Sequence, residues 1–312
     1  MNYLLANQQE TNVDFGPLLV GSSEAVCPQS YYILSMKYLF FVVFTQQKTH
    51  SPYNLLKASS MCGMTLSRDD AFNQWLAGVI DGDGCFLVSK AGYCSCEISF
   101  GIHDEPLLMR IKQVLGGSVK PRAGINSFRY RLHNTPGMIE LVNRVNGYIR
   151  NTVRISQLKR VCDRLGIECI PPQNLTLQST WFAGFFDSEG TVTFSLKEYG
   201  TNGLMRPQLT IGASNKKKEN LLIFIDWFGG NVYYDKSSDG YVWSISSRED
   251  IEFFLKYTKE TSSIRSVKLH RLLLIPKYYK LVELQAFRLD APSLLIKAWY
   301  RFLVRWNKYH DL

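Results

Sequence analysis

The sequence lacks a stretch long and apolar enough to be a membrane-spanning helix. Its most apolar run, Tyr31 to Phe44, has 14 residues and includes Lys37, whereas a span needs about 20 apolar residues. We therefore expect no stable membrane insertion, although a peripheral membrane contact stays open for this run. Lys37 is the first basic residue, and Glu10, Asp14 and Glu24 precede it, which argues against an Arg-rich, acid-poor transit peptide.

The seven cysteines contain no CxxC pair, the spacing that many metal-binding and redox motifs share. Cys94 and Cys96 alternate with polar residues in an expected strand, so we interpret them as core residues rather than zinc ligands. An odd number of cysteines without paired spacing favours a reducing compartment.

Acidic residues are fewer than basic ones, 27 Asp and Glu against 36 Lys and Arg, which gives a net charge of +9. Residues 1–68 hold four of the basic and three of the acidic residues, so residues 69–312 carry 32 against 24, or +8. Such an excess predicts a polyanionic partner for residues 69–312. The length of 312 residues and the hydrophobic content of 46% allow two cores.

One ten-residue stretch occurs twice. The copies are Trp75–Gly84 (WLAGVIDGDG) and Trp181–Gly190 (WFAGFFDSEG), and five of the ten positions are identical. Each copy predicts an apolar helix that ends at its last glycine, a residue suited to a helix C-cap, and then runs into a strand. Small residues in the middle of each copy allow two helices to approach closely. Because helices this apolar must be buried, we expect the two copies to pack against each other.

Both copies place acids at the C-terminal end of the expected helix, where the helix dipole disfavours negative charge. If the helices pair in parallel, Asp83 and Glu189 meet at one end, and two close carboxylates repel each other. A hard divalent cation such as Mg²⁺ or Mn²⁺ removes this repulsion, since it binds carboxylate and carbonyl oxygens. The alternative is two core helices with acidic ends, but the repetition of the penultimate acid favours a metal site.

The pattern after each copy predicts the same order of elements. In the first half, strands are expected at 85–90, 94–103, 118–122 and 127–133, and helices at 105–115, 136–147 and 153–165. In the second half, strands are expected at 191–197, 208–214, 231–235 and 241–246, and helices at 217–228 and 248–257. The fold class is therefore α+β, a pseudo-two-fold tandem of two αββαββα units. A period of about 110 residues indicates domain duplication rather than a solenoid.

These elements divide the chain into five parts: an N-terminal extension (1–68), a first half (69–170), a Pro-containing linker (171–180), a second half (181–282) and a basic tail (283–312). The tail interleaves Trp299, Phe302 and Trp306 with lysines and arginines, which predicts an amphipathic helix. We favour docking of this helix on the core over contact with a nucleic acid.

Alternation in the strands separates an apolar face, expected to lie under the helices, from a polar face. In the strand at 94–103, the apolar face should run from Cys94 to Ile102 and the polar face from Ser95 to His103. The polar faces are rich in side chains that match phosphates and base edges, although a merely solvated face is the alternative. The expected DNA contacts are Ser89, Lys90, Glu97, Ser99, Lys120, Arg122, Arg129, Arg131, His133, Ser195, Lys197, Gln208, Thr210, Tyr233 and Ser244.

The polar faces of the two halves differ. Arg129 and Arg131 in the first half correspond to Val242 and Ser244 in the second. A symmetric target would not need this difference, so we expect a non-palindromic double-stranded DNA site bound by a monomer that acts as a pseudo-dimer.

The two ten-residue copies resemble the signature of the LAGLIDADG homing endonucleases, in the single-chain form with two motifs. The resemblance covers residues 69–282 and implies a saddle of antiparallel sheets with the two motif helices at the interface. It also implies a nuclease that makes a double-strand break in a long DNA site with Mg²⁺. In this family the penultimate acids, here Asp83 and Glu189, bind the metals, and the carbonyls of Gly82 and Ser188 would help.

The resemblance implies further catalytic residues. A basic residue, most often Lys, lies near the start of the helix that follows the fourth strand, and the matches here are Arg154 and Arg265. An arginine can stabilise negative charge but cannot transfer protons near neutral pH. A polar residue after the second strand is also typical, and the matches are Asp104 and Asn215.

Some members of the family are maturases that help their host group I intron RNA to splice, and many are encoded in organellar introns. The resemblance therefore implies a mitochondrion or chloroplast and leaves intron RNA open as a second partner. The presence of both motif acids favours retained DNA cleavage, because a pure maturase could lose them without penalty. A binding module, either an RNA maturase or a DNA-binding regulator, is the second alternative. A membrane-associated role for residues 31–44 and the tail is the third alternative.

Overall fold

The computed structural model describes residues 66–199 and 204–309. The expectations for the apolar run Tyr31–Phe44, and for nearly all of the N-terminal extension, lie outside the described residues. Among the residues that are described, no helix combines the length and apolarity needed to cross a bilayer.

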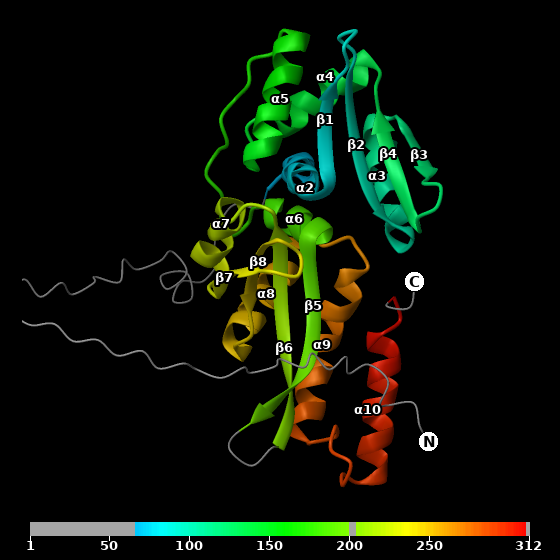
Figure 1. Ribbon diagram of the computed structural model, residues 1–312, viewed down its shortest axis with the longest axis vertical. Coiled ribbons are helices and arrows are strands. Elements are labelled where there is room, and N and C mark those ends of the chain that lie inside the picture. The colour runs from blue at the N-terminus through cyan, green and yellow to red at the C-terminus, as the bar shows by residue number, and fades with distance from the viewer. Residues whose placement is uncertain (1–65, 200–203, 310–312) are drawn as a thin grey trace, which may run out of the picture. The chain divides into compact units, whose positions relative to one another are not determined.

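The first half begins with a motif helix and builds a four-stranded antiparallel sheet in the order β1-β2-β4-β3 (Figure 1). Its elements are α2 (Arg68–Asp83), β1 (Gly84–Val88), β2 (Cys94–Gly101), the short 3₁₀ helix η1 (Ile102–Asp104), α3 (Glu105–Leu115), β3 (Ser118–Pro121), β4 (Ser127–Leu132), α4 (Thr135–Val145) and α5 (Thr152–Leu165). Ser67 caps α2, since its Oγ accepts a hydrogen bond from the Asp70 backbone N–H at 3.0 Å.

The second half repeats this order, with a sheet in the order β5-β6-β8-β7. Its elements are α6 (Trp181–Glu189), β5 (Gly190–Tyr199), β6 (Leu204–Asn215), α7 (Glu219–Phe228), β7 (Asn231–Asp235), β8 (Gly240–Ile245), α8 (Arg248–Thr261), α9 (Lys268–Glu283) and α10 (Ser293–Trp306). Residues 166–180, between the halves, form neither helix nor strand. The predicted α+β tandem is confirmed.

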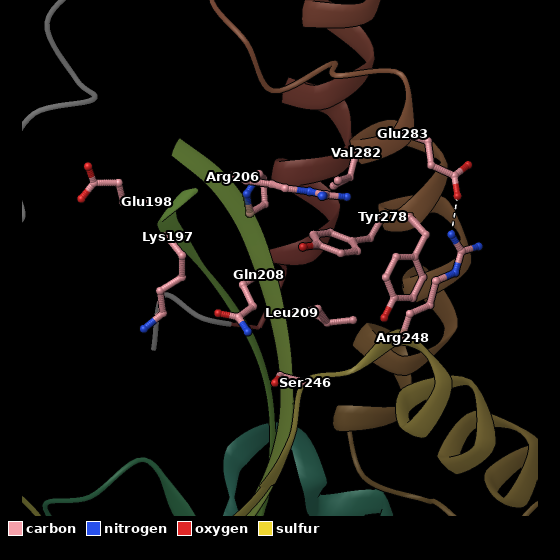
Figure 2. Close-up of a pocket in the computed structure, with 12 residues that line it drawn as sticks. Lys197, Glu198, Arg206, Gln208, Leu209, Ser246, Arg248, Tyr278, Val282 and Glu283 are labelled. Carbon is pink, nitrogen blue, oxygen red and sulfur yellow. Dashed lines mark hydrogen bonds and ion pairs between the residues drawn. The ribbon is translucent and has the colours of Figure 1, made fainter. Parts of the chain in front are cut away.

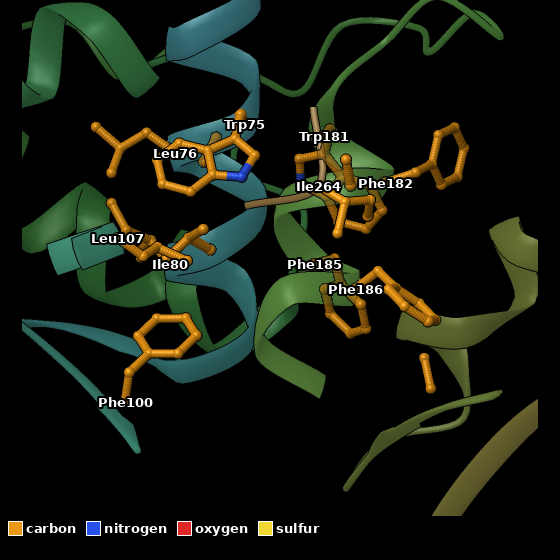
Figure 3. Close-up of a cluster of buried hydrophobic side chains, with 14 of the residues drawn as sticks. Trp75, Leu76, Ile80, Phe100, Leu107, Trp181, Phe182, Phe185, Phe186 and Ile264 are labelled. Atoms are coloured by element: carbon orange, nitrogen blue, oxygen red, sulfur yellow. The ribbon is translucent and has the colours of Figure 1, made fainter. Parts of the chain in front are cut away.

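The two motif helices, α2 and α6, pack directly against each other, and Figure 3 shows the indole rings of Trp75 and Trp181 where the helices meet. The approach is close because each helix has a glycine at the contact. A Cβ atom on Gly78 would lie 2.1 Å from the Trp181 carbonyl oxygen, and one on Gly184 would lie 1.9 Å from the Trp75 carbonyl oxygen. The predicted helix pairing is therefore confirmed.

The apolar faces of the sheets lie under the helices, as expected. In β2, Cys94, Cys96, Ile98 and Phe100 are buried, and the two cysteines are free thiols within the core. The prediction for Ile102 was wrong, because this side chain is 43% exposed. Strand β2 ends at Gly101 and the chain turns into η1, so residues 102–104 leave the two-residue periodicity of the strand.

The tail helix α10 docks on the core through its aromatic face, as predicted. Trp299, Phe302 and Trp306 are buried, and their rings contact Phe194 of β5. Phe302 and Trp306 also contact Tyr278 of α9.

Candidate functional site

The first acid of each motif links the two motif helices. The Asp81 carboxylate accepts a hydrogen bond from Trp181 Nε1 at 2.8 Å. It also accepts from the backbone N–H groups of Arg150, at 2.7 Å, and Asn151, at 3.1 Å. Burial raises the pKa of Asp81 to about 7, while the three donors favour the carboxylate. Asp81 is therefore a structural anchor, which ties α2 to α6 and to the start of α5.

Asp187 makes the equivalent contacts in the second half. Its carboxylate accepts from Trp75 Nε1 at 2.8 Å and from the backbone N–H groups of Arg265, at 3.0 Å, and Ser266, at 2.8 Å. Neither Asp81 nor Asp187 is accessible to solvent. Each motif helix thus donates an indole N–H to the anchoring acid of the other helix.

These anchors set the structural alignment of the halves. Arg150 occupies the place of Arg265, an offset of 115 residues, so Arg154 corresponds to Leu269. The match of Arg154 with Arg265 from the sequence, an offset of 111, was wrong. The guanidinium Cζ of Arg265 lies 4.0 Å from the centre of the Trp75 ring and not beside the penultimate acids. Burial, and then the charge of Arg110, lower the pKa of Arg265 to about 10.

The penultimate acids, Asp83 and Glu189, come together where the C-terminal ends of α2 and α6 meet. A Cβ atom on Gly82 would lie 2.4 Å from the Ser188 Cβ and 3.1 Å from the Glu189 Cγ. Burial, and then the charge of Asp83, raise the pKa of Glu189 to about 7. Asp83 retains contact with solvent, but partial loss of hydration still raises its pKa. The two acids therefore form the repelling pair that the motif predicted.

Two cations face this pair. The charges of Lys268 and then of Arg154 offset part of the rise in the pKa of both acids, and Arg154 Nη2 lies 3.4 Å from the Gly82 carbonyl oxygen. The Lys268 ammonium donates to the carbonyl oxygens of Asp187, at 2.7 Å, and Ser188, at 2.6 Å.

Sequence reasoning missed Lys268. Its signal was present, because Lys268 lies three residues after Arg265 and is the first residue of α9. A lysine was also the side chain that the family resemblance led us to expect near the start of this helix.

The donor set around the acid pair suits a hard cation. In the described ranges, 66–199 and 204–309, no group of three or more His, Cys, Asp or Glu residues could hold a metal ion. Two carboxylates are nevertheless enough for Mg²⁺ when substrate phosphates and water complete its shell. The expected carbonyl ligands, on Gly82 and Ser188, accept hydrogen bonds from Arg154 and Lys268, although each carbonyl oxygen has a second lone pair.

The two polar residues expected to be catalytic hold helix ends. Asp104 Oδ1 accepts a hydrogen bond from the Val267 backbone N–H at 2.8 Å. Asn215 Oδ1 accepts from the Lys217 backbone N–H at 3.1 Å and from Asn220 Nδ2 at 2.9 Å. Both residues therefore serve the packing of helices beside the site.

Most of the residues expected to contact DNA lie on the open faces of the two sheets, whereas Ser89, Lys90, Arg122 and His133 lie just beyond the ends of strands. All of them are exposed or half-buried. In the first sheet, Glu97 lies opposite Arg131 and Ser99 lies opposite Arg129. Glu97 accepts from Arg131 Nε at 2.6 Å and forms an ion pair with Arg129 Nη1 at 3.3 Å. One carboxylate therefore orients two arginines on this face and offsets part of their charge.

The second sheet extends further along the strand direction, because β5 and β6 pair beyond the end of β8. A hollow of about 340 Å³ lies beside this extension (Figure 2). Lys197 and Gln208, two of the expected DNA contacts, line it together with Arg206 and Tyr278. The polar surface of the second half thus continues past the four-stranded part of its sheet.

Comparison with known proteins supports the family resemblance. A sequence model described as LAGLIDADG endonuclease matches residues 76–164. The chain is 46% identical over 237 residues to the intron-encoded RNA maturase bI4 of Saccharomyces cerevisiae, covering 76% of this chain and 36% of the relative. It is 38% identical over 301 residues to the probable intron-encoded endonuclease aI2 of Debaryomyces hansenii, covering 93% and 44%. The chain thus spans less than half the length of these two relatives.

A third relative matches over most of its own length. It is the intron-encoded DNA endonuclease ai2a of Dictyostelium discoideum, which is 30% identical over 240 residues, with 75% of this chain and 74% of the relative covered.

Solved structures share the fold. The LAGLIDADG meganuclease I-AabMI, bound to uncleaved DNA, aligns with a TM-score of 0.57 and 18% identity, covering 72% of this chain and 97% of that one. I-SmaMI, bound to an uncleaved DNA target in the presence of calcium ions, aligns with a TM-score of 0.54 and 14% identity, covering 77% and 99%.

Proposed function

The chain belongs to the LAGLIDADG endonuclease family, and from this premise we propose that it is a site-specific DNA endonuclease. It makes a double-strand break in a long, non-palindromic site by metal-dependent hydrolysis of phosphodiester bonds. The observation that carries the proposal is the meeting of Asp83 and Glu189 at the paired ends of α2 and α6. A protein that only bound DNA would gain nothing from two repelling carboxylates there.

Asp83 and Glu189 would hold Mg²⁺, or another divalent cation such as Mn²⁺, with help from the carbonyls of Gly82 and Ser188. When bound, the ion polarises the scissile phosphate and lowers the pKa of a water molecule. The calcium ions named with the DNA complex of I-SmaMI support a divalent ion in this fold.

Arg154 and Lys268 supply positive charge beside the acid pair, one from each half. Their side chains can stabilise the negative charge that develops on the phosphate oxygens during cleavage. Arg154 acts only as a fixed charge, whereas the pKa of Lys268 is lowered by burial despite the carboxyl groups around it.

The open sheet faces would bind the DNA through the side chains predicted from the sequence. Arginine and lysine contact phosphates and guanine edges, while Ser, Thr and Gln match other base edges. The first face carries Arg129 and Arg131 where the second carries Val242 and Ser244, which supports a target without two-fold symmetry. It also supports a single chain as the active species, and sedimentation or size-exclusion measurement of mass on DNA would test this.

Substitution of the motif acids tests the cleavage proposal. Asp83→Asn and Glu189→Gln should each abolish cleavage of the intronless allele of the gene that carries this reading frame. Binding should persist, because the sheet faces are unchanged. Glu260→Gln, an exposed acid on α8, is the control and should cleave like the wild type. Full cleavage by either motif variant would rule out this metal site.

RNA maturation is a second candidate, favoured by the 46% identity to a relative described as an RNA maturase. The names of several relatives also describe them as intron-encoded, which supports an organellar, and in particular a mitochondrial, location. Splicing of the host intron RNA with purified protein would test this role. If Asp83→Asn protein still promotes splicing, the two activities are separable.

A further inference from the structure

Asp104, in the first half, caps a helix of the second half. Its Oδ1 accepts a hydrogen bond from the Val267 backbone N–H at 2.8 Å, and α9 begins at the next residue, Lys268. An ionised acceptor strengthens such a bond and complements the positive end of the helix dipole. Asp104 is only 9% exposed, so the packing of η1 fixes this carboxylate in place.

Lys268 couples the position of α9 to the position of the metal-binding pair. Its ammonium donates to carbonyl oxygens of residues 186, 187 and 188 at the C-terminal end of α6. Glu189 is the next residue, so the same ammonium holds the end of the helix that presents Glu189. A shift in the first turn of α9 would therefore move both the positive charge and the acid.

The charge distribution points the same way. The carboxyl groups that act on Lys268 are those of Asp187, Asp83, Asp104 and Glu189. Among these four, Asp104 is the one outside the two motifs. It therefore adds a negative charge that keeps Lys268 in place without occupying a metal-binding position.

The first half has a weaker version of this link. Asn215 Oδ1 accepts from Asn220 Nδ2, and Asn220 Oδ1 accepts from the Thr152 backbone N–H at 3.4 Å, at the start of α5. This path is neutral, indirect and long, whereas the Asp104 path is charged, direct and short. Lys217 Nζ adds an exposed contact to Thr152 Oγ1 at 3.1 Å, but neither contact at the start of α5 comes from a buried carboxylate such as Asp104.

We propose that Asp104 is a positioning residue for Lys268, through which the first half sets the second half's share of the cleavage site. The inference deepens the proposed nuclease function and rests on it. It gives Asp104 a positioning role in place of the catalytic role that the family resemblance implied. Because Lys268 belongs to one half, loss of Asp104 should impair cleavage of one DNA strand more than the other.

Strand-resolved cleavage tests the proposal. The substrate is a duplex with a different dye on each strand. It is cut in a single turnover at saturating protein, so that differences in DNA affinity do not affect the measured cleavage rate. Asp104→Ala should slow one strand by at least about tenfold relative to the other, since a displaced catalytic group can lose up to about a hundredfold. Asp104→Asn keeps the Oδ1 acceptor and should restore most of the rate.

Two further variants separate positioning from folding. Val267→Pro removes the same hydrogen bond from the donor side, and the φ of Val267, −58°, already lies in the range of proline. It should slow the same strand as Asp104→Ala. Asn220→Ala breaks the weaker link and should change the ratio of the two strand rates little.

A double-mutant cycle with Lys268→Met identifies the path. If Asp104 acts through Lys268, then adding Asp104→Ala to Lys268→Met should slow cleavage no further. Equal slowing of both strands by Asp104→Ala, or an undiminished effect in the Lys268→Met background, would overturn the proposal.

A spectroscopic readout keeps this test independent of cleavage. The side-chain NMR resonance of Lys268, assigned by its loss in Lys268→Met, should move in Asp104→Ala and move less in Asp104→Asn, which loses the charge but keeps the acceptor for Val267. If wild-type protein cuts neither strand, the nuclease function fails, yet this resonance still reports on positioning. A Lys268 resonance that Asp104→Ala leaves unchanged would refute the role given to Asp104.

Discussion

Replacement of Gly184 by alanine should destabilise the contact between the motif helices. The higher helix propensity of alanine should be too small to offset this loss. The added Cβ would lie 1.9 Å from the Trp75 carbonyl oxygen, whereas ordinary contact begins at 3.4 Å. The helices must then separate by about 1.5 Å, because a backbone oxygen cannot rotate away as a side chain can. Overpacking typically costs 1–3 kcal/mol or more, and alanine gains only about 1 kcal/mol over glycine within a helix.

We therefore expect Gly184→Ala to lower the free energy of unfolding by at least about 3 kcal/mol, at the upper end of overpacking effects, as measured by urea denaturation. Gly101→Ala is the matched control. A Cβ there has no atom within 4 Å, and the φ of Gly101, −59°, suits any residue, so the change should stay within about 0.5 kcal/mol. Equal stability of the two variants would refute the argument that glycine is needed for helix contact.

Three more predictions follow from single interactions. Trp75→Phe removes an indole donor from buried Asp187 and should lower the free energy of unfolding by about 2 kcal/mol. Trp243→Phe is the control and should cost about 1 kcal/mol, because the Trp243 indole donates to a neutral carbonyl. Equal losses in thermal unfolding would contradict this. Glu97→Gln frees two paired arginines and should strengthen non-specific DNA binding. The plot of log affinity against log salt concentration should become steeper by about one unit of slope. An unchanged slope in a salt titration would argue against a DNA role for that face. The pKa of Glu189 is raised from 4.5 to about 7, so the folded metal-free protein binds this proton more tightly than the unfolded chain does. The free energy of unfolding should therefore fall as pH rises from 4.5 through 7, and the affinity for Mg²⁺ should rise over the same range. Calorimetry that finds a pH-independent affinity would show that Glu189 does not bind the ion.

The pairing of Asp83 with Glu189 could be predicted because duplication carries its own geometric information. Two copies of a buried helix with small residues at the same positions have one simple way to pack, which brings their ends together. The penultimate acid of each copy then follows, without any knowledge of the sheets. The core residues of the strands could be predicted for a similar reason, since the alternation of apolar and polar residues shows which face of a strand is buried.

The partners of the acid pair could not be found in the same way. The halves differ in length mainly in the hairpin of the first two strands, because Gly84 pairs with Ile98 but Gly190 pairs with Ala213. The offset that aligns Asp81 with Asp187 therefore does not align the residues that contact these two acids. Only the hydrogen bonds from backbone N–H groups to Asp81 and Asp187 show that Arg150 matches Arg265. Lys268 therefore emerges from three-dimensional contacts and not from the spacing of basic residues.

The first acid of each motif was also hard to interpret from sequence, because it looks as charged and as badly placed as the second. Burial separates them. Asp81 and Asp187 each receive an indole N–H from the opposite helix, so neither has its full set of donors unless both halves are present. A half folded alone would leave a buried carboxylate short of one hydrogen bond to a charged group, at a cost of roughly 1.5–3 kcal/mol, in addition to the helix contact at Gly78 and Gly184. The site at Asp83 and Glu189 is thus a property of the joined chain, which is why one polypeptide with two unequal halves can present two carboxylates at one point and two different faces to the asymmetric DNA site that we propose as its target.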